Sequence, residues 1–172
     1  MSHPIRFALV GKSGSGKSSI GVRLSGLTGV DHVRTGLVCR QIARTLFGNE
    51  DKRSTQTLDD ALTAIDPSIF LRAALRPYGE DASYVLDALR FESDALLARD
   101  LGCRIVRVVA PSKLRHERLR VRGQSFDPGT DGLHRSEMEL DAIQVDHEIV
   151  NDGDIARLDQ ALEAVLAKEQ LA

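Results

Sequence analysis

Residues 11–18 read GKSGSGKS and lie between the apolar segment IRFALV (residues 5–10) and the segment SIGVRLSGL (residues 19–27). The stretch fits the pattern G-x-x-x-x-G-K-[ST], with Gly11, Gly16, Lys17 and Ser18 at the fixed positions. Glycines allow successive backbone N–H groups to point inward at an anion, and the helix that follows adds its positive N-terminal end. A glycine-rich strand-to-helix turn is the alternative. The apolar strand before the stretch and the helix after it favour phosphate binding.

The fixed side chains of this phosphate loop predict a nucleoside triphosphate and a magnesium ion as its ligands. Lys17 has the place of the lysine that reaches the β- and γ-phosphates, and the Ser18 hydroxyl has the place of an Mg²⁺ ligand. ATP and Mg²⁺ are therefore the expected cofactors. We expect the nucleotide phosphates to contact Gly11, Ser13, Gly14, Ser15, Gly16, Lys17, Ser18 and Ser19.

The composition argues for one globular domain and against several other classes of protein. The chain has 172 residues, 42% of them hydrophobic, and a net charge of −2, so nothing suggests a nucleic-acid polymer as partner. The two cysteines have no C-x-x-C spacing, which argues against a zinc site or a disulfide framework. The start MSHPIRF lacks the layout of a signal peptide, and no apolar run approaches the ~20 residues that span a bilayer. We expect a cytoplasmic protein without a membrane partner, as a monomer or a homodimer.

Strands and helices alternate along the whole chain. Runs such as FALV and IVRVVA do not alternate polar with apolar residues, which is typical of strands buried on both faces. The pattern predicts a three-layer α/β/α domain over residues 1–172, with a five-stranded parallel sheet. Strands are expected at residues 5–10, 32–34, 84–86, 104–109 and 148–150. Helices are expected at residues 18–27, 37–47, 57–65, 68–75, 91–101, 113–121 and 155–168.

A carboxylate follows the third predicted strand, at the edge where open α/β sheets bind ligands. Asp87 at that position is expected to hold the Mg²⁺ shell, directly or through water. Its alternative role is the N-cap of the following helix. Arg90 lies three residues further and is a candidate for gripping an acceptor phosphate in a two-pronged fashion, with a solvated surface arginine as the alternative.

Two further groups of arginines flank the predicted site. Arg115, Arg118 and Arg122 recur at helical spacing and lead into the Gly- and Asp-rich stretch 122–135. They predict a lid over residues 113–141, with Arg118 and Arg122 supplying positive charge during phosphoryl transfer; a solvated basic face is the alternative. Arg34 and Arg40 flank the start of a helical stretch, residues 35–80, that is expected to bind the acceptor. The five histidines show no metal-ligand spacing, and this chemistry needs no catalytic imidazole.

With these parts in order, the chain resembles the nucleoside monophosphate kinase superfamily. RTGLVCRQIA (residues 34–43) is similar to the adenylate kinase segment in which Thr-Gly precedes an acceptor-binding arginine, although Leu37 replaces the usual acidic residue. VLDALRFESDALLARDLGCRIVRV (residues 85–108) resembles the phage-type deoxynucleoside monophosphate kinases. HRSEMELD (residues 134–141) resembles an element after the lid in those enzymes and in animal-type phosphomevalonate kinases.

The last strand and helix carry a second resemblance. DHEIVNDGDIARLDQAL (residues 146–162) is similar to the last strand and helix of two groups of enzymes. One group contains the phage-type deoxynucleoside monophosphate kinases and the animal-type phosphomevalonate kinases, and the other contains the dephospho-coenzyme A kinases. The resemblance implies that Asn151 and Gly153 lie near the donor adenine. From the residues alone, NDGD is a strand-to-helix turn with Asp154 as N-cap, and both interpretations can hold together.

These observations predict a kinase that transfers the γ-phosphoryl group of ATP to a small phosphorylated acceptor. A (deoxy)nucleoside monophosphate is the expected acceptor, held by Arg34, Arg40 or Arg90. Dephospho-coenzyme A kinase or another small-molecule kinase is one alternative. A nucleotide-binding switch that binds ATP without phosphorylating a metabolite is the other.

Overall fold

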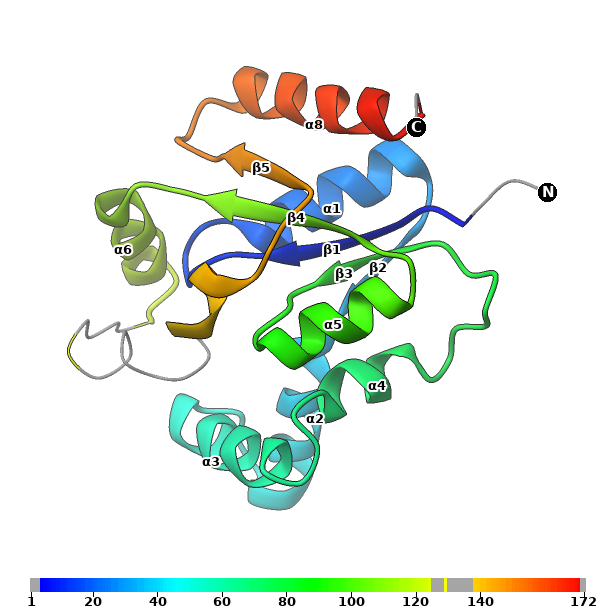
Figure 1. Ribbon diagram of the computed structural model, residues 1–172. Coiled ribbons are helices and arrows are strands. Elements are labelled where there is room, and N and C mark those ends of the chain that lie inside the picture. The colour runs from blue at the N-terminus through cyan, green and yellow to red at the C-terminus, as the bar shows by residue number, and fades with distance from the viewer. Residues whose placement is uncertain (1–3, 125–128, 130–137, 171–172) are drawn as a thin grey trace.

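A five-stranded sheet forms the centre of the computed structural model, which describes residues 4–124, 129 and 138–170 (Figure 1). All described strand pairs are parallel, and the strand order is β2-β3-β1-β4-β5. The strands are β1 (Arg6–Val10), β2 (Asp31–Arg34), β3 (Tyr84–Asp87), β4 (Arg104–Val109) and β5 (His147–Val150). This sheet confirms the predicted α/β class.

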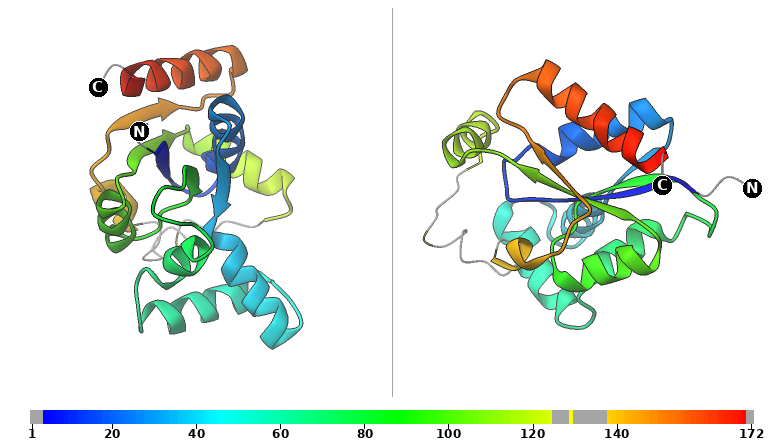
Figure 2. Two further views of the ribbon diagram at one scale, coloured as in Figure 1. Left: turned by 90° about the vertical axis from the view of Figure 1, so that its right-hand side faces the viewer. Right: turned by 45° about the horizontal axis from the view of Figure 1, so that its top comes forward.

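Helices cover both faces of the sheet and extend from one of its edges. They are α1 (Lys17–Thr28), α2 (Thr35–Phe47), α3 (Lys52–Thr63), α4 (Ile69–Leu75), α5 (Glu92–Asp100), α6 (Ser112–Val121) and α8 (Ile155–Gln170), with the 3-10 helix η2 (Glu139–Ala142). Figure 2 shows α1 and α8 on one face and α5 on the other, while α2 and α3 project beyond the sheet.

Two apolar clusters fill the layers on either side of the sheet. Phe7 and Leu9 of β1 pack with Ile20 of α1 and Leu162 of α8 on one face. On the other face, Ala8 and Val10 pack with residues of α5, α4 and η2. Because both faces of β1 are buried, its sequence is a continuous apolar run without alternation, as predicted.

A third cluster holds α2, α3 and α4 together at the side of the sheet. Cys39 and Ala43 of α2 pack there with Leu58 of α3 and Phe70 of α4. This small core gives the predicted acceptor-binding region, residues 35–80, its own packing while its first helix continues directly from β2.

Every predicted strand and helix boundary agrees with the structure to within two residues, except the start of α3. α3 begins at Lys52, five residues before its predicted start, because the Asp51 carboxylate caps it by accepting a 2.8 Å hydrogen bond from Ser54 N. The 3-10 helix η2 was not predicted. No helix in the described part of the chain is long and apolar enough to cross a membrane.

Candidate active site

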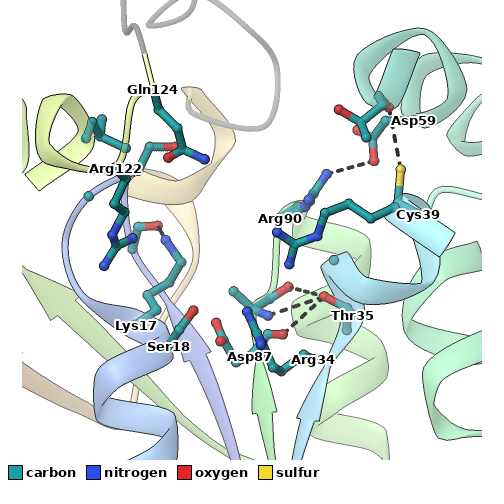
Figure 3. A pocket seen from close by; sticks show the side chains of 18 of the residues that line it. Lys17, Ser18, Arg34, Thr35, Cys39, Asp59, Asp87, Arg90, Arg122 and Gln124 are labelled. Carbon is teal, nitrogen blue, oxygen red and sulfur yellow. Dashed lines mark hydrogen bonds and ion pairs between the residues drawn. The ribbon is translucent and has the colours of Figure 1, made fainter. Parts of the chain in front are cut away.

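A cavity of about 710 Å³ opens at the carboxyl ends of β1, β2 and β3. Figure 3 shows Lys17 and Ser18 on one side of it, Arg90 and Cys39 on the other, and Asp87 between them. The phosphate loop and the start of α1 therefore share one cavity with α2, α3 and the segment after β3. This is the sheet edge at which the sequence analysis predicted ligand binding.

The phosphate loop connects β1 to α1 as predicted. Gly16 adopts φ 97° at the N-cap of α1 and, as a glycine, has no side chain with which to cap this helix end. The positive end of the helix lies at Lys17 and Ser18, which line the cavity, and favours an anion there. Lys17 Nζ donates to the carbonyl oxygens of Gly11 at 2.5 Å and Lys12 at 3.1 Å, which holds it across the loop.

The loop is supported from behind by the turn after β5. Asn151 is buried, and its Nδ2 donates a 2.9 Å hydrogen bond to the Ser15 carbonyl. A Cβ at Gly16 would collide with that Nδ2 atom. Gly16 is therefore required by its left-handed backbone and by the close approach of Asn151.

Arg118 of α6 links the same two segments. Its Nη1 donates to the Ser15 carbonyl at 3.3 Å and its Nη2 donates to Asn151 Oδ1 at 3.1 Å. Burial, followed by the charge of Arg122, lowers the pKa of Arg118. These contacts place Arg118 beneath the loop, outside the residues that line the cavity.

The two ends of the predicted lid region are both packed in the structure. Arg115 of α6 donates to the Ser13 carbonyl at 3.0 Å, and Arg122 lines the cavity just after α6 ends. At the other end, Leu140 of η2 is buried, and Lys12 Nζ lies 2.7 Å from Asp141 Oδ2. Residues 125–128 and 130–137, including the first half of the HRSEMELD element, lie outside the described residues.

Asp87 is buried at the end of β3 and lines the cavity. The next helix, α5, begins only at Glu92, so the alternative that Asp87 caps this helix is wrong. The N-cap of α5 is Phe91, and the Asp94 carboxylate supports this helix end by accepting from the backbone N–H groups of Arg90 at 2.9 Å and Phe91 at 3.2 Å. Thr35 Oγ1 donates a 3.0 Å hydrogen bond to the Ala88 carbonyl and thereby fixes the backbone after Asp87.

Three arginines that were predicted to bind the acceptor line the cavity: Arg34, Arg40 and Arg90. Arg90 is already paired, because its Nη1 lies 2.8 Å from Oδ1 of Asp59, a carboxylate with only 4% of its side chain exposed. Within the described part of the chain, no carboxylate pairs with Arg34 or Arg40. Among the described residues, these two arginines therefore add positive charge to the cavity without a direct ion-pair partner.

Cys39 of α2 lies in the same wall. Its thiol donates to the Thr55 carbonyl at 3.5 Å, and burial followed by the charge of Asp59 raises its pKa, against the smaller opposing effect of Arg90 and Arg40. The thiol is therefore protonated and weakly nucleophilic at neutral pH.

The cavity brings together most residues that the sequence singled out. It is lined by Gly11, Ser13, Gly14, Lys17, Ser18, Arg34, Arg40, Asp87, Arg90 and Arg122. The remaining candidates lie outside its lining: Ser15, Gly16, Ser19, Arg118, Asn151 and Gly153. Asp154, by contrast, accepts a 3.1 Å bond from Arg157 N and caps α8, as the turn interpretation predicted.

The sequence interpretation missed several lining residues, namely Cys39, Glu50, Thr55, Gln56 and Asp59. All lie in the region assigned to the acceptor, but none follows a motif. The signal for Asp59 was its place in the segment TLDDALTAI, where apolar Leu58 and Leu62 mark the buried face of α3. A carboxylate beside such a face needs a partner, and Arg90 supplies it.

The donor set of this cavity suits magnesium. Ser18 and Asp87 offer hard oxygen ligands beside the lysine and the uncapped helix end. The described residues contain no group of three or more His, Cys, Asp or Glu side chains that could hold a metal ion alone. A site with one or two protein oxygens is the usual arrangement for Mg²⁺ that binds together with nucleotide phosphates.

No protein-family model and no curated protein matches the sequence. Solved structures do. A gluconokinase from Sinorhizobium meliloti 1021 aligns with a TM-score of 0.58 at 18% identity, over 99% of this chain and 97% of that one. A sugar kinase from Janibacter sp. HTCC2649 aligns with a TM-score of 0.54 at 19% identity, over 98% of this chain and 96% of that one. TT1252 from Thermus thermophilus aligns with a TM-score of 0.54 at 20% identity, over 97% of this chain and 98% of that one.

The likeness shows the fold. This chain has the α/β architecture of those kinases over nearly its full length, with its own phosphate loop after β1. At these identities the chemistry must be argued from the residues of the cavity.

Proposed function

We propose that this protein is an ATP- and Mg²⁺-dependent kinase that phosphorylates a small anionic acceptor, with a (deoxy)nucleoside monophosphate as the first candidate. The observation that carries this proposal is one cavity lined by Lys17, Ser18 and Asp87 together with three arginines, Arg34, Arg40 and Arg90. Figure 3 shows Lys17 and Ser18 on one side of Asp87 and Arg90 on the other. Phosphoryl transfer requires donor and acceptor phosphates side by side with concentrated positive charge, and this arrangement supports both requirements.

Each wall has a separate role in this account. The loop amides and Lys17 bind the donor phosphates, and Ser18 and Asp87 hold Mg²⁺, which neutralises charge on the transferring group. Arg122, beside the loop, adds positive charge where negative charge develops. Arg34 and Arg40 bind the acceptor anion, while Asp59 keeps the Arg90 guanidinium in place.

A polyhydroxylated acceptor, such as a sugar or a sugar acid, is the second candidate. Its support is the lining of the acceptor side, where Thr55, Gln56, Asp59 and Glu50 offer hydrogen bonds. The described lining contains no aromatic ring on which a nucleobase could stack. Two proteins with this fold are also described as a gluconokinase and a sugar kinase.

An acceptor panel separates these candidates. Formation of ADP from ATP–Mg²⁺ is measured with each ribo- and deoxyribonucleoside monophosphate, dephospho-coenzyme A, phosphomevalonate and gluconate, and without acceptor. Stimulation by one or more monophosphates supports the first candidate, and stimulation by gluconate alone supports the second. Tight ATP binding without stimulation by any acceptor contradicts the kinase and favours a nucleotide-binding switch.

A further inference from the structure

His32 of β2 lies directly behind Asp87. Its Nε2 atom is 3.4 Å from Asp87 Oδ2, and the side chains are only 13% and 7% exposed. This separation is long for an aligned hydrogen bond, yet Nε2 has no other partner in the described part of the chain. A buried imidazole nitrogen facing a buried carboxylate oxygen is attracted to it only if that nitrogen carries a hydrogen.

Strand register brings these two residues together. β2 pairs with β3 so that His32 is opposite Val85 and Arg34 is opposite Asp87. Asp87 is thus the diagonal neighbour of His32 on the same sheet face, at a spacing that long side chains bridge. Val85 belongs to the cluster packed against α1, which places His32 and Asp87 on the α1 side.

Helix α1 fixes the imidazole from the other side. A Cβ at Gly21 would collide with His32 Nε2, so the ring occupies the space that the missing side chain leaves. Gly21 lies three residues after Ser18 and therefore on the same face of the helix. A glycine in a helix interior destabilises the helix relative to alanine, and this contact gives a reason for its presence.

We propose that His32 is a positioning residue: its Nε2–H group orients the Asp87 carboxylate by holding Oδ2, which leaves Oδ1 to serve the Mg²⁺–nucleotide in the cavity. Thr35, from the same strand end, fixes the backbone after Asp87, while His32 fixes its side chain. Groups behind a metal ligand commonly orient it in this way. The inference rests on the proposed function, because it assigns Asp87 to the metal.

The first test uses the ligand-free protein and needs no activity. Nitrogen-15 NMR of the histidine rings at pH 8 identifies which ring nitrogen of His32 carries the hydrogen, with His32→Gln used for assignment. The proposal requires the Nε2–H tautomer. A dominant Nδ1–H tautomer overturns it, because Nε2 would then present a lone pair to the carboxylate.

The second test measures metal binding. Electron paramagnetic resonance of free Mn²⁺ gives its affinity for the protein–ATP complex in wild type, His32→Leu and His32→Gln. Loss of the donor in His32→Leu is expected to weaken Mn²⁺ about tenfold, the lower end of the range for such orienting partners. His32→Gln retains an amide donor and is expected to restore most of the affinity. Equal Mn²⁺ affinity in wild type and a folded His32→Leu overturns the proposal.

His147→Gln is the matched control. His147 Nε2 also contacts a carboxylate, Glu169 Oε1 at 2.6 Å, but at the start of β5 and thus at the opposite sheet edge. This variant is expected to lower thermal stability without changing Mn²⁺ affinity. A comparable loss of affinity in His147→Gln would show that general loosening, and not His32, governs the metal site.

Gly21→Ala provides a third readout, because it displaces the ring without removing it. Alone it is expected to weaken Mn²⁺ binding, whereas in the His32→Leu background it should add little further loss. If the losses of Mn²⁺ affinity in Gly21→Ala and His32→Leu were fully additive in the double variant, the proposal that Gly21 acts through His32 would be overturned. Absence of acceptor-dependent turnover in the wild type would defeat the proposed function, while the tautomer and the Mn²⁺ affinities would still decide the role of His32.

Discussion

Arg90 Nη1 donates a 2.8 Å hydrogen bond to Oδ1 of Asp59, joining the segment after β3 to the buried face of α3. The Asp59 side chain is 4% exposed, whereas the Arg90 side chain is 40% exposed and lines the cavity. A charged group that is held on one side and open on the other is suited to bind a ligand with little loss of side-chain entropy. We therefore expect Asp59 to determine how well Arg90 binds the proposed acceptor.

Asp59→Asn is expected to raise the KM for the acceptor about tenfold and to leave the KM for ATP unchanged. The estimate follows from a charge-assisted hydrogen bond that contributes about 1.5–3 kcal/mol, part of which the asparagine retains. Steady-state kinetics measure both constants. The matched control is Asp60→Asn at the adjacent exposed position. An increase confined to the KM for ATP would contradict this role.

Arg122→Ala is expected to lower kcat about a hundredfold with a smaller change in the KM for ATP, as for other groups that stabilise developing charge. Arg122 lines the cavity next to the phosphate loop, whereas Arg120 is exposed and outside its lining. Arg120→Ala is therefore the control, with kcat near wild type. Similar losses in both variants would show that Arg122 acts only through the general charge of α6.

Asn151→Ala is expected to weaken ATP binding and to lower the free energy of unfolding by about 1–3 kcal/mol, because the buried loop carbonyl of Ser15 and the Arg118 guanidinium lose a partner. Calorimetric titration with ATP and thermal unfolding measure the two effects. Asn49, the other asparagine, is exposed, and Asn49→Ala should leave ATP binding unchanged. Wild-type ATP affinity in Asn151→Ala would disprove the support of the loop by this turn.

Cys39 offers a chemical test of the acceptor side. Its raised pKa predicts slow alkylation by iodoacetamide at pH 7, with a rate that increases as the pH rises and the thiolate forms. Alkylation of Cys39 should block turnover. A saturating concentration of acceptor should slow the alkylation more than ATP does. Cys39→Ser should be active and resistant, although Cys103 remains. Inactivation of Cys39→Ser at the wild-type rate would exclude Cys39 as the target.

The parallel sheet, the phosphate loop and the position of Asp87 could all be predicted from the sequence. Local signals carry them: an uninterrupted apolar strand, fixed glycine and lysine spacing, and a carboxylate at a strand end. α3 was predicted too short because its N-terminal turn lacks apolar periodicity and depends on the Asp51 cap.

Residues that act through tertiary contacts could not be predicted. Asp59 meets Arg90 across 31 positions of sequence, and His32 meets Asp87 only through the register of β2 and β3. Gly21 provided a signal, since a glycine in the middle of a helix indicates close packing, but nothing local names its neighbour. The contacts of Arg118 with the loop likewise depend on how α6 packs.

The measurement that tests the central claim most directly is phosphorus-31 NMR of ATP–Mg²⁺ with the best acceptor from the panel, in wild type and Lys17→Ala. The account predicts that the wild type converts ATP to ADP together with one new phosphorylated acceptor. It predicts that Lys17→Ala, folded by circular dichroism, forms neither. A Lys17→Ala variant with wild-type turnover, or a wild type that releases only inorganic phosphate, would contradict the account.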